Sequence, residues 1–382
     1  MHDRLALGVA DVSDVALAAI VGRSLGLADG AEIELLESSA RVAPYDLEAL
    51  TTAGRYWVHG RARTPAGEQP FTIFVKVVQS WSRSPIFAFV PEELRELALA
   101  SLPWQVEPLM YRSDLSARLP DGLSMPKAYA VIDLDETSAA IWIEKVDQFD
   151  DGWDADRFVR AAHLLGRLAG SERVRATART GRGEEQRLVR GYAQGRVMHQ
   201  IVPALRGDDL WSHPLMAGTF DDELRADLLA AADDLDAIVD ELEALPVATL
   251  HGDACTRNLL ARNGTEEMVL IDLGFWGEGP VGFDLGQLLL GEVQLGERPA
   301  GCLPSLEPPC LLAYLQGLEA EGYSVQPATV RRAHALQMLL FNGLSAVPLE
   351  HLGSPPTADL LELAGQRASA ARFVLDLVRA TA

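Results

Sequence analysis

Residues 247–290 read VATLHGDACTRNLLARNGTEEMVLIDLGFWGEGPVGFDLGQLLL, the most informative stretch of the 382-residue chain. A short apolar run ends at His251, Gly252 and Asp253, and Asn258 follows five positions after Asp253. A second apolar run leads directly into Asp272. The pattern predicts two short strands that each deliver polar side chains at their ends.

The polar residues of this stretch match the needs of one reaction. Transfer of a phosphoryl group to a hydroxyl requires a carboxylate that orients the hydroxyl and accepts its proton. It also requires an Asn and an Asp that hold Mg²⁺ against a triphosphate. Taken singly, Asp253, Asn258 and Asp272 could each stabilise a turn or a strand end. Their joint spacing favours Asp253 as the catalytic base and Asn258 and Asp272 as metal ligands.

The order of these residues is also similar to that of the protein-kinase catalytic loop, with Gly252 where a protein kinase has arginine. The stretch resembles the aminoglycoside phosphotransferase and choline kinase-like family, which comprises small-molecule kinases of the protein-kinase-like fold. Residues 30–290 follow the family in outline, and residues 251–284 are the specific part. The resemblance implies that the protein transfers the γ-phosphoryl group of ATP to a hydroxyl of a small molecule, with Mg²⁺ as the metal.

Lys76 is a single charge among the alternating apolar residues of the run FTIFVKVV, residues 71–78. A buried strand face tolerates a charge only if it is paired, and the alternative is an edge-strand lysine that discourages aggregation. The resemblance implies that Lys76 binds the α- and β-phosphates and pairs with a helix glutamate. We expect Glu107 to be that partner, although Pro108 directly after it is awkward inside a helix. The competing glutamates are Glu92, Glu93 and Glu96.

The resemblance assigns further positions. Backbone groups of Glu144 and Val146 are expected to bind adenine. His251 is expected to brace the catalytic loop, and Asp284 to support it from below or to cap the helix that follows. The protein-kinase glycine-rich loop is absent between the first two strands, so Thr52 and its neighbours in residues 50–54 are expected to cover the phosphates.

Apolar spacing along the chain predicts an α+β fold. Residues 13–27 and 91–111 have helical spacing, and from residue 154 onward the chain is mostly helical. Short β-type runs occupy residues 33–42, 56–62, 71–78, 128–133 and 139–146. The resemblance converts this order into two lobes: an antiparallel-sheet N-terminal lobe over residues 1–143, a hinge over 144–150, and a mainly helical lobe over 151–382 that carries the catalytic loop, residues 251–258.

Composition excludes several classes of protein. The net charge of −22 argues against nucleic-acid binding, which needs clustered Lys and Arg, and is compatible with a cationic substrate. Three cysteines without CxxC spacing argue against a disulfide framework or a zinc cluster. No apolar run is long enough to span a membrane, and the N-terminus lacks the basic start of a signal peptide, so we expect a cytoplasmic protein.

The sequence also argues against two common nucleotide-binding motifs. None of the three lysines, Lys76, Lys127 and Lys145, is followed by Ser or Thr, which excludes a P-loop. Residues 277–282 match G-x-G-x-x-G, but they contain Pro280 and lie in a mostly helical half without a βαβ unit, so we expect a turn there.

The identity of the acceptor stays open at this stage. Acidic residues near the connector and farther along could bind an aminoglycoside, a peptide antibiotic or an amino-sugar, or could simply be solvated: Asp147, Asp150, Asp151, Asp154, Asp156, Asp208 and Asp209. A sugar or other metabolite kinase is the alternative within the same fold. A catalytically silent nucleotide-binding scaffold is the alternative from another class.

Overall fold

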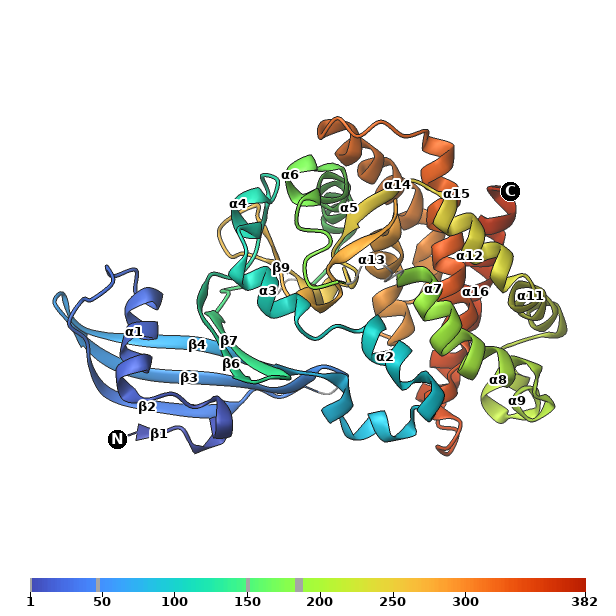
Figure 1. Cartoon of the computed structure of the whole chain (residues 1–382). Coiled ribbons are helices and arrows are strands. Elements are labelled where there is room, and N and C mark those ends of the chain that lie inside the picture. Colours follow the sequence, from blue (N-terminus) through green and yellow to red (C-terminus); the bar gives the residue numbers. More distant parts are fainter. Residues whose placement is uncertain (1, 46–48, 149–151, 183–187) are drawn as a thin grey trace.

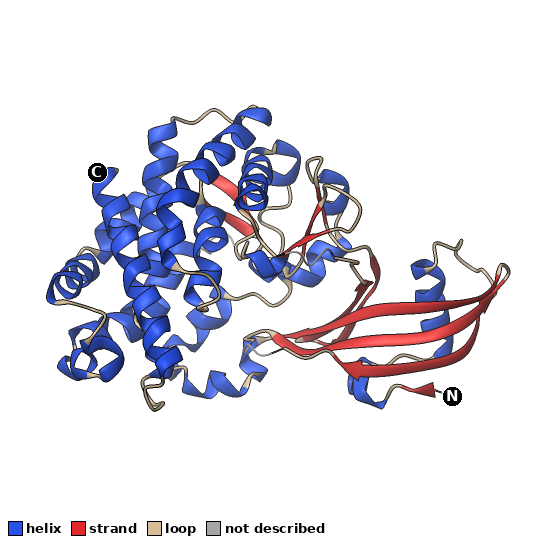
Figure 2. Cartoon of the chain, turned by 180° about the vertical axis from the view of Figure 1, so that it is seen from behind, coloured by secondary structure: helices blue, strands red, loops and turns tan. Residues whose placement is uncertain are grey.

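The computed structural model describes residues 2–45, 49–148, 152–182 and 188–382. A long, curved sheet forms one end of the molecule, and a larger body of helices forms the other (Figure 1). The view from behind shows the same division, with two short sheets placed among the helices (Figure 2). Within the described part of the chain, no helix is long and apolar enough to cross a membrane.

The large sheet has six strands in the order β1-β2-β3-β4-β7-β6. Only the β1–β2 pair is parallel, and the remaining pairs are antiparallel. The β3–β4 hairpin turns at Gly67, whose φ of 111° is a conformation that glycine adopts readily. The strands are β1 (His2–Asp3), β2 (Glu34–Val42), β3 (Thr52–Thr64), β4 (Gly67–Gln79), β6 (Ala128–Asp135) and β7 (Ser138–Glu144).

The two faces of this sheet have different partners because successive side chains of a strand point to opposite faces. On one face, Ile73, Val75 and Trp142 form a buried core with apolar residues of α1 (Asp14–Ser24). On the other face, Phe74 and Lys76 of β4 are directed toward the helical body. The sheet therefore carries a polar site on the side opposite its own core.

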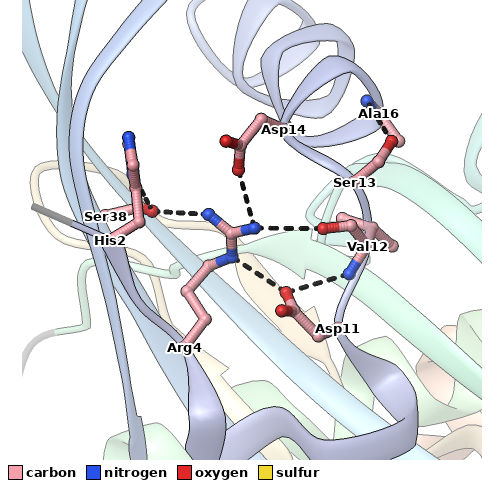
Figure 3. A network of polar contacts seen from close by, with 8 residues as sticks. All are labelled: His2, Arg4, Asp11, Val12, Ser13, Asp14, Ala16 and Ser38. Carbon is pink, nitrogen blue, oxygen red and sulfur yellow. Dashed lines mark hydrogen bonds and ion pairs between the residues drawn. The ribbon is translucent and has the colours of Figure 1, made fainter.

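Arg4 fastens the start of the chain to this sheet (Figure 3). Its buried guanidinium forms ion pairs with Asp11 and Asp14, both at 2.8 Å, and donates to Ser38 Oγ at 2.7 Å and to the Val12 carbonyl at 3.1 Å. A buried charge is tolerated when its hydrogen-bonding groups are satisfied in this way. The network fixes the start of α1 against β2.

The segment that links β4 to β6 differs from the single helix predicted over residues 91–111. The structure has two helices, α2 (Arg95–Ser101) and α3 (Val106–Arg112), separated by a short break that contains Pro103. Pro108 lies in the first turn of α3, where the missing N–H removes no intrahelical hydrogen bond. The break thus removes the difficulty that Pro108 raised, and Glu107 lies at the start of a helix.

The helical body is built around a close crossing of α5 (Ala155–Gly170) and α14 (Leu303–Ala320). Glycines make this approach possible: a Cβ on Gly166 would lie 2.1 Å from the Tyr314 carbonyl oxygen, and one on Gly317 would lie 2.1 Å from the His163 carbonyl oxygen. The other helices of the body are α6 (Glu172–Arg175), α7 (Leu188–Tyr192), α8 (Val202–Arg206), α9 (Asp208–Ser212), α10 (Pro214–Ala217), α11 (Asp222–Asp233), α12 (Leu235–Ala244), α13 (Phe283–Gln294), α15 (Pro327–Met338) and α16 (Ala358–Ala380).

Two small sheets lie among the helices (Figure 2). One has the order β5-β10-β9 and joins β5 (Leu123–Ser124), after the short helix α4 (Leu115–Arg118), to β10 (Met268–Leu270) and β9 (Leu259–Ala261). The other pairs β8 (Val247–Leu250) with β11 (Gly277–Pro280) in antiparallel fashion. The G-x-G-x-x-G pattern therefore runs through an antiparallel strand into α13, which is not the parallel βαβ setting of a dinucleotide site.

Candidate active site

The segment from His251 to Asn258 is held from below by one carboxylate. Asp284, in the first turn of α13, accepts hydrogen bonds from the backbone N–H groups of His251 and Gly252, each at 2.9 Å. Gly252 has φ of 84°, and a Cβ there would lie 2.3 Å from the Phe275 carbonyl oxygen. Glycine is therefore required at the position where a protein kinase has arginine.

His251 is fully buried and braces the segment from inside. Its Nε2 lies 2.9 Å from the Ile271 carbonyl oxygen, and its Nδ1 lies 3.3 Å from the backbone N–H of Asp253. Burial lowers the pKa of His251 to about 4, so the imidazole is neutral near pH 7. A neutral ring can donate through Nε2 and accept through Nδ1, which suits both contacts.

Asp253 and Asn258 are in direct contact. The Asn258 side-chain amide donates to the Asp253 carboxylate Oδ2 and to the Asp253 carbonyl, each at 2.9 Å. Burial, followed by the negative charge of Asp272, raises the pKa of Asp253 to about 7. A carboxylate with a pKa close to the working pH is suited to accept a proton during a reaction.

Asp272 has an unusual backbone. Its φ of 60° and ψ of 61° are left-handed, and no other non-glycine residue in the described ranges has a positive φ. Such a conformation is mildly strained and is often found at functional sites. Antiparallel pairing of β9 with β10, extended by the 3.1 Å hydrogen bond from the Ile271 N–H to the Asn258 carbonyl, keeps Asn258 beside Asp272.

Lys76 connects the large sheet to this segment. Its Nζ lies 2.6 Å from Glu107 Oε2 and 2.8 Å from Asp272 Oδ1. Burial by itself would lower the pKa of Lys76, but the carboxylates of Asp272 and Glu107 raise it above its ordinary value, so the ammonium stays charged. Two carboxylates that are distant in sequence, Glu107 and Asp272, therefore contact one buried ammonium group.

A cavity of about 570 Å³ opens at this cluster. Charged side chains line one portion of it, namely Arg55, Lys76, Glu107 and Asp272. Apolar side chains enclose it from both sides, with Trp57, Phe74 and Ile143 from the large sheet and Leu260 and Ile271 from the helical body. The Trp57 and Phe74 rings meet edge to face with centroids 4.8 Å apart. Its volume is within the usual range of small-molecule sites.

The remaining predicted cofactor residues are placed as follows. Glu144 and Val146 line the cavity, but the Glu144 N–H already donates to the Lys127 carbonyl at 2.9 Å, and its carboxylate pairs with Arg262 at 2.5 Å. Thr52 begins β3 opposite Val78 and is not among the described residues that line the cavity. The last part of the predicted hinge, residues 149 and 150, lies outside the described residues.

Among the cavity residues that the sequence analysis missed, three lie on the large sheet: Arg55, Trp57 and Phe74. A signal for them existed, because Arg55 lies opposite Lys76 and Trp57 lies opposite Phe74 in the β3–β4 register. Counting residues from the turn at Gly67 would have placed all four side chains on one face.

Three of the acidic residues considered for a cationic acceptor have partners or capping roles outside the cavity. Asp147 pairs with Lys145 at 3.2 Å, Asp154 caps α5, and Asp208 pairs with Arg225 at 3.0 Å. Neither these nor Asp156 and Asp209 are among the described cavity-lining residues, and Asp150 and Asp151 lie outside the described part of the chain.

Comparisons with known proteins place the chain. The sequence model of the phosphotransferase enzyme family matches residues 114–325, which is more than half of the chain. No curated protein matches the sequence of this chain. An aminoglycoside phosphotransferase from Alicyclobacillus acidocaldarius is similar in structure, with 16% identity, 98% of each chain covered and a TM-score of 0.49. For an ethanolamine kinase from Plasmodium vivax the identity is 11%, the coverage 90% of this chain and 84% of the other, and the TM-score 0.47.

A spectinomycin phosphotransferase in complex with ADP and spectinomycin has 11% identity, covers 97% of this chain and 98% of its own, and has a TM-score of 0.42. The predicted α+β class is confirmed, with a mostly antiparallel sheet at one end of the molecule and helices at the other. The chain therefore belongs to the phosphotransferase enzyme family.

Proposed function

We propose that the protein transfers the γ-phosphoryl group of ATP to a hydroxyl of a small molecule with the help of Mg²⁺. The observation that carries this proposal is the cluster at one end of the cavity, where Lys76 contacts Asp272, together with the adjoining loop, which holds Asn258 against Asp253. These are the side chains that phosphoryl transfer requires for phosphate binding, metal binding and orientation of the acceptor.

The nucleotide would lie between the two lobes, which we place at residues 1–143 and 151–382. The apolar walls around Trp57 and Leu260 suit a purine ring, and backbone groups near Glu144 and Val146 would bind its edge. Lys76 would hold phosphate oxygens while Glu107 keeps its ammonium in place.

Asn258 and Asp272 fit the requirements of a magnesium site. Both present hard oxygen atoms beside the cavity, and the Asn258 amide nitrogen is already used on Asp253, which leaves its carbonyl oxygen for a metal. A magnesium ion held by these two oxygens would supply positive charge beside the phosphates. The protein's own contribution is to hold these two oxygens in fixed positions through the β9–β10 pair and the left-handed Asp272 backbone.

Asp253 would act on the acceptor. Its carboxylate, oriented by Asn258, accepts the proton of the acceptor hydroxyl as that oxygen forms a bond to the γ-phosphorus. The bond between this phosphorus and the ADP oxygen breaks, and the products are ADP and a phosphate ester. His251 and Asp284 hold the loop and take no proton in this scheme.

For the acceptor we propose an aminoglycoside, a peptide antibiotic or an amino-sugar, with a sugar or other metabolite as the alternative. The strongly acidic chain favours a cationic molecule, whereas the described cavity lining contains Arg157 and Arg257 as well as Glu292. A panel of aminoglycosides, peptide antibiotics, amino-sugars and neutral sugars, offered with γ-labelled ATP, distinguishes these classes. Transfer of label to neutral sugars alone would overturn the amine-bearing acceptor.

The other class to separate is a silent nucleotide-binding scaffold. Asp253→Asn keeps the shape of the side chain and its contact with Asn258 but removes the base. We expect wild-type protein to transfer phosphoryl groups and the variant to lose at least about a thousandfold in kcat while binding nucleotide normally. Nucleotide binding by the wild type without transfer to any compound would favour the scaffold, and an active Asp253→Asn variant would overturn the mechanism.

A further inference from the structure

Arg55 has no role in the scheme above, yet its side chain lies in the cavity beside the metal-binding residues. It is 13% exposed, and its Nη2 lies 3.7 Å from Asp272 Oδ2. In the β3–β4 register it is directly opposite Lys76. Two cations therefore face the same carboxylate from neighbouring strands.

Like charges directly opposite each other on a sheet face are unfavourable, so this pair needs a source of negative charge. Glu107 and Asp272 supply it in the structure, as two carboxylates for two cations. A divalent metal on Asp272 would change that balance, because the carboxylate that now faces Arg55 and Lys76 would bind the metal instead. The two cations would then require an anionic ligand.

The orientation of Arg55 is fixed from outside the cavity. Its guanidinium carbon lies 3.5 Å from the centroid of the Tyr45 ring, in the segment that follows β2. Stacking on an aromatic face holds the plane of a guanidinium and leaves the N–H groups at its edge free to donate. Those donors match the paired oxygens of a phosphate group.

The backbone around Arg55 is strand and not a loop over the phosphates. β3 begins at Thr52, with a bulge between Thr52 and Gly54, and the Arg55 carbonyl accepts from the Ala43 N–H at 2.8 Å. A Cβ on Gly54 would lie 2.5 Å from the Tyr56 hydroxyl, so this glycine serves local packing. A side chain is therefore better placed than this backbone to reach the phosphates.

We propose that Arg55 is a phosphate-binding side chain that takes over the task of the missing glycine-rich loop. Without nucleotide it pairs with Asp272. When nucleotide and metal bind, Asp272 turns to the metal and Arg55 donates to the oxygens of the β- and γ-phosphates. This inference rests on the proposed function, because it requires a nucleoside triphosphate in the cavity.

The test compares binding of AMP, ADP and ATP, each with Mg²⁺, to wild type, Arg55→Gln and Arg55→Lys by calorimetry. Arg61→Gln is the matched control, because Arg61 lies on the same strand with its side chain 54% exposed and directed at surface glutamates. Loss of a charge-assisted bond corresponds to a roughly ten- to hundredfold weaker Kd. We expect that loss for ATP with Arg55→Gln, a smaller loss for ADP and nearly none for AMP.

Arg55→Lys keeps the charge but not the forked donors, so its loss should be intermediate. This milder variant also keeps the test decisive if Arg55→Gln folds poorly. Equal losses for AMP and ATP, or wild-type affinity in both variants, would overturn the inference and leave the proposed function intact. A wild type that binds no ATP would overturn the proposed function itself.

Discussion

Lys76 Nζ and Glu107 Oε2 lie 2.6 Å apart with side chains only 6% and 4% exposed. Lys76 belongs to the fourth strand of the large sheet, and Glu107 belongs to α3. The ion pair therefore couples the position of α3 to the site where Lys76 meets Asp272. Because the pair is buried, removal of one partner leaves the other charge poorly compensated.

Glu107→Gln should therefore reduce both stability and nucleotide binding. Breaking a buried pair costs about 3–5 kcal/mol when the remaining charge has no partner. Lys76 keeps Asp272, so the loss should fall at the lower end of that range, and the KM for ATP should rise because the ammonium is drawn toward Asp272. Urea unfolding and steady-state kinetics measure the two effects. Glu96→Gln, at an exposed site in α2, is the control, and equal behaviour of the two variants would contradict the role of Glu107.

Asp272→Asn should separate metal dependence from anion binding. The change removes a proposed metal ligand and the charge that faces both Lys76 and Arg55. We expect metal-dependent phosphoryl transfer to disappear, while metal-free ATP binds more tightly than to wild type because two cations lose their carboxylate partner. Calorimetry with and without Mg²⁺ measures this reversal. Weaker metal-free binding would mean that Asp272 does not compete with phosphate for these cations.

Gly252→Ala should damage the catalytic loop more than its backbone angle alone explains. The new Cβ would meet the Phe275 carbonyl oxygen at 2.3 Å, in addition to the strain of φ at 84°. Gly264→Ala is the matched control, since its φ is 73° and its Cβ would meet nothing within 4 Å. Left-handed strain costs about 1–3 kcal/mol, which both variants should show, and Gly252→Ala should lose more stability and most of its activity. Similar losses in thermal melts of the two variants would rule out the close contact.

His334→Gln should make the protein less sensitive to acid. His334 is fully buried, and burial lowers its pKa to about 4 from an ordinary value near 6.5. Below pH 6.5 His334 is protonated in the unfolded chain but stays neutral in the folded protein. Its contribution to stability is therefore fully present above pH 6.5. It is lost as pH falls toward 4, at about 1.4 kcal/mol per pH unit.

Urea unfolding between pH 7 and 4.5 measures that slope. The variant should show a shallower fall of stability, although His251, whose pKa is also lowered to about 4, retains its own contribution. His199→Gln at an exposed position should leave the slope unchanged. Indistinguishable slopes for wild type and His334→Gln would show that His334 is protonated as readily in the folded protein as in the unfolded chain.

Much of this protein could be predicted from short stretches of sequence. The run FTIFVKVV forms a strand with its lysine on the cavity side. His251 and Asp253 follow β8 and Asp272 follows β10, as their spacing indicated, whereas Asn258 ends a short turn before β9. The prediction of one helix over residues 91–111 was less accurate, because apolar spacing continues across the break at Pro103. Pro103 is a local signal for this break that apolar spacing does not register, since the residue before a proline is disfavoured in the helical conformation.

The ion-pair partners that meet across the cavity could not be predicted from short stretches of sequence. The choice of Glu107 among four glutamates depends on where α3 packs, and the contact between Arg55 and Asp272 joins residues more than two hundred positions apart. Such contacts depend on how the large sheet is set against the helical body, which no local pattern encodes.

The sequence by itself indicated the proposed reaction class, because the spacing within one short loop limits which oxygen atoms can act together. It also determined the alternation that turns Lys76 toward the cavity. Only the tertiary structure decided which charges neutralise Lys76, that Arg55 shares Asp272 with it, and that Asp147 near the connector pairs with Lys145. The physical reason is that local spacing follows from backbone geometry, whereas the balance of buried charges depends on every side chain that packing brings within a few ångströms.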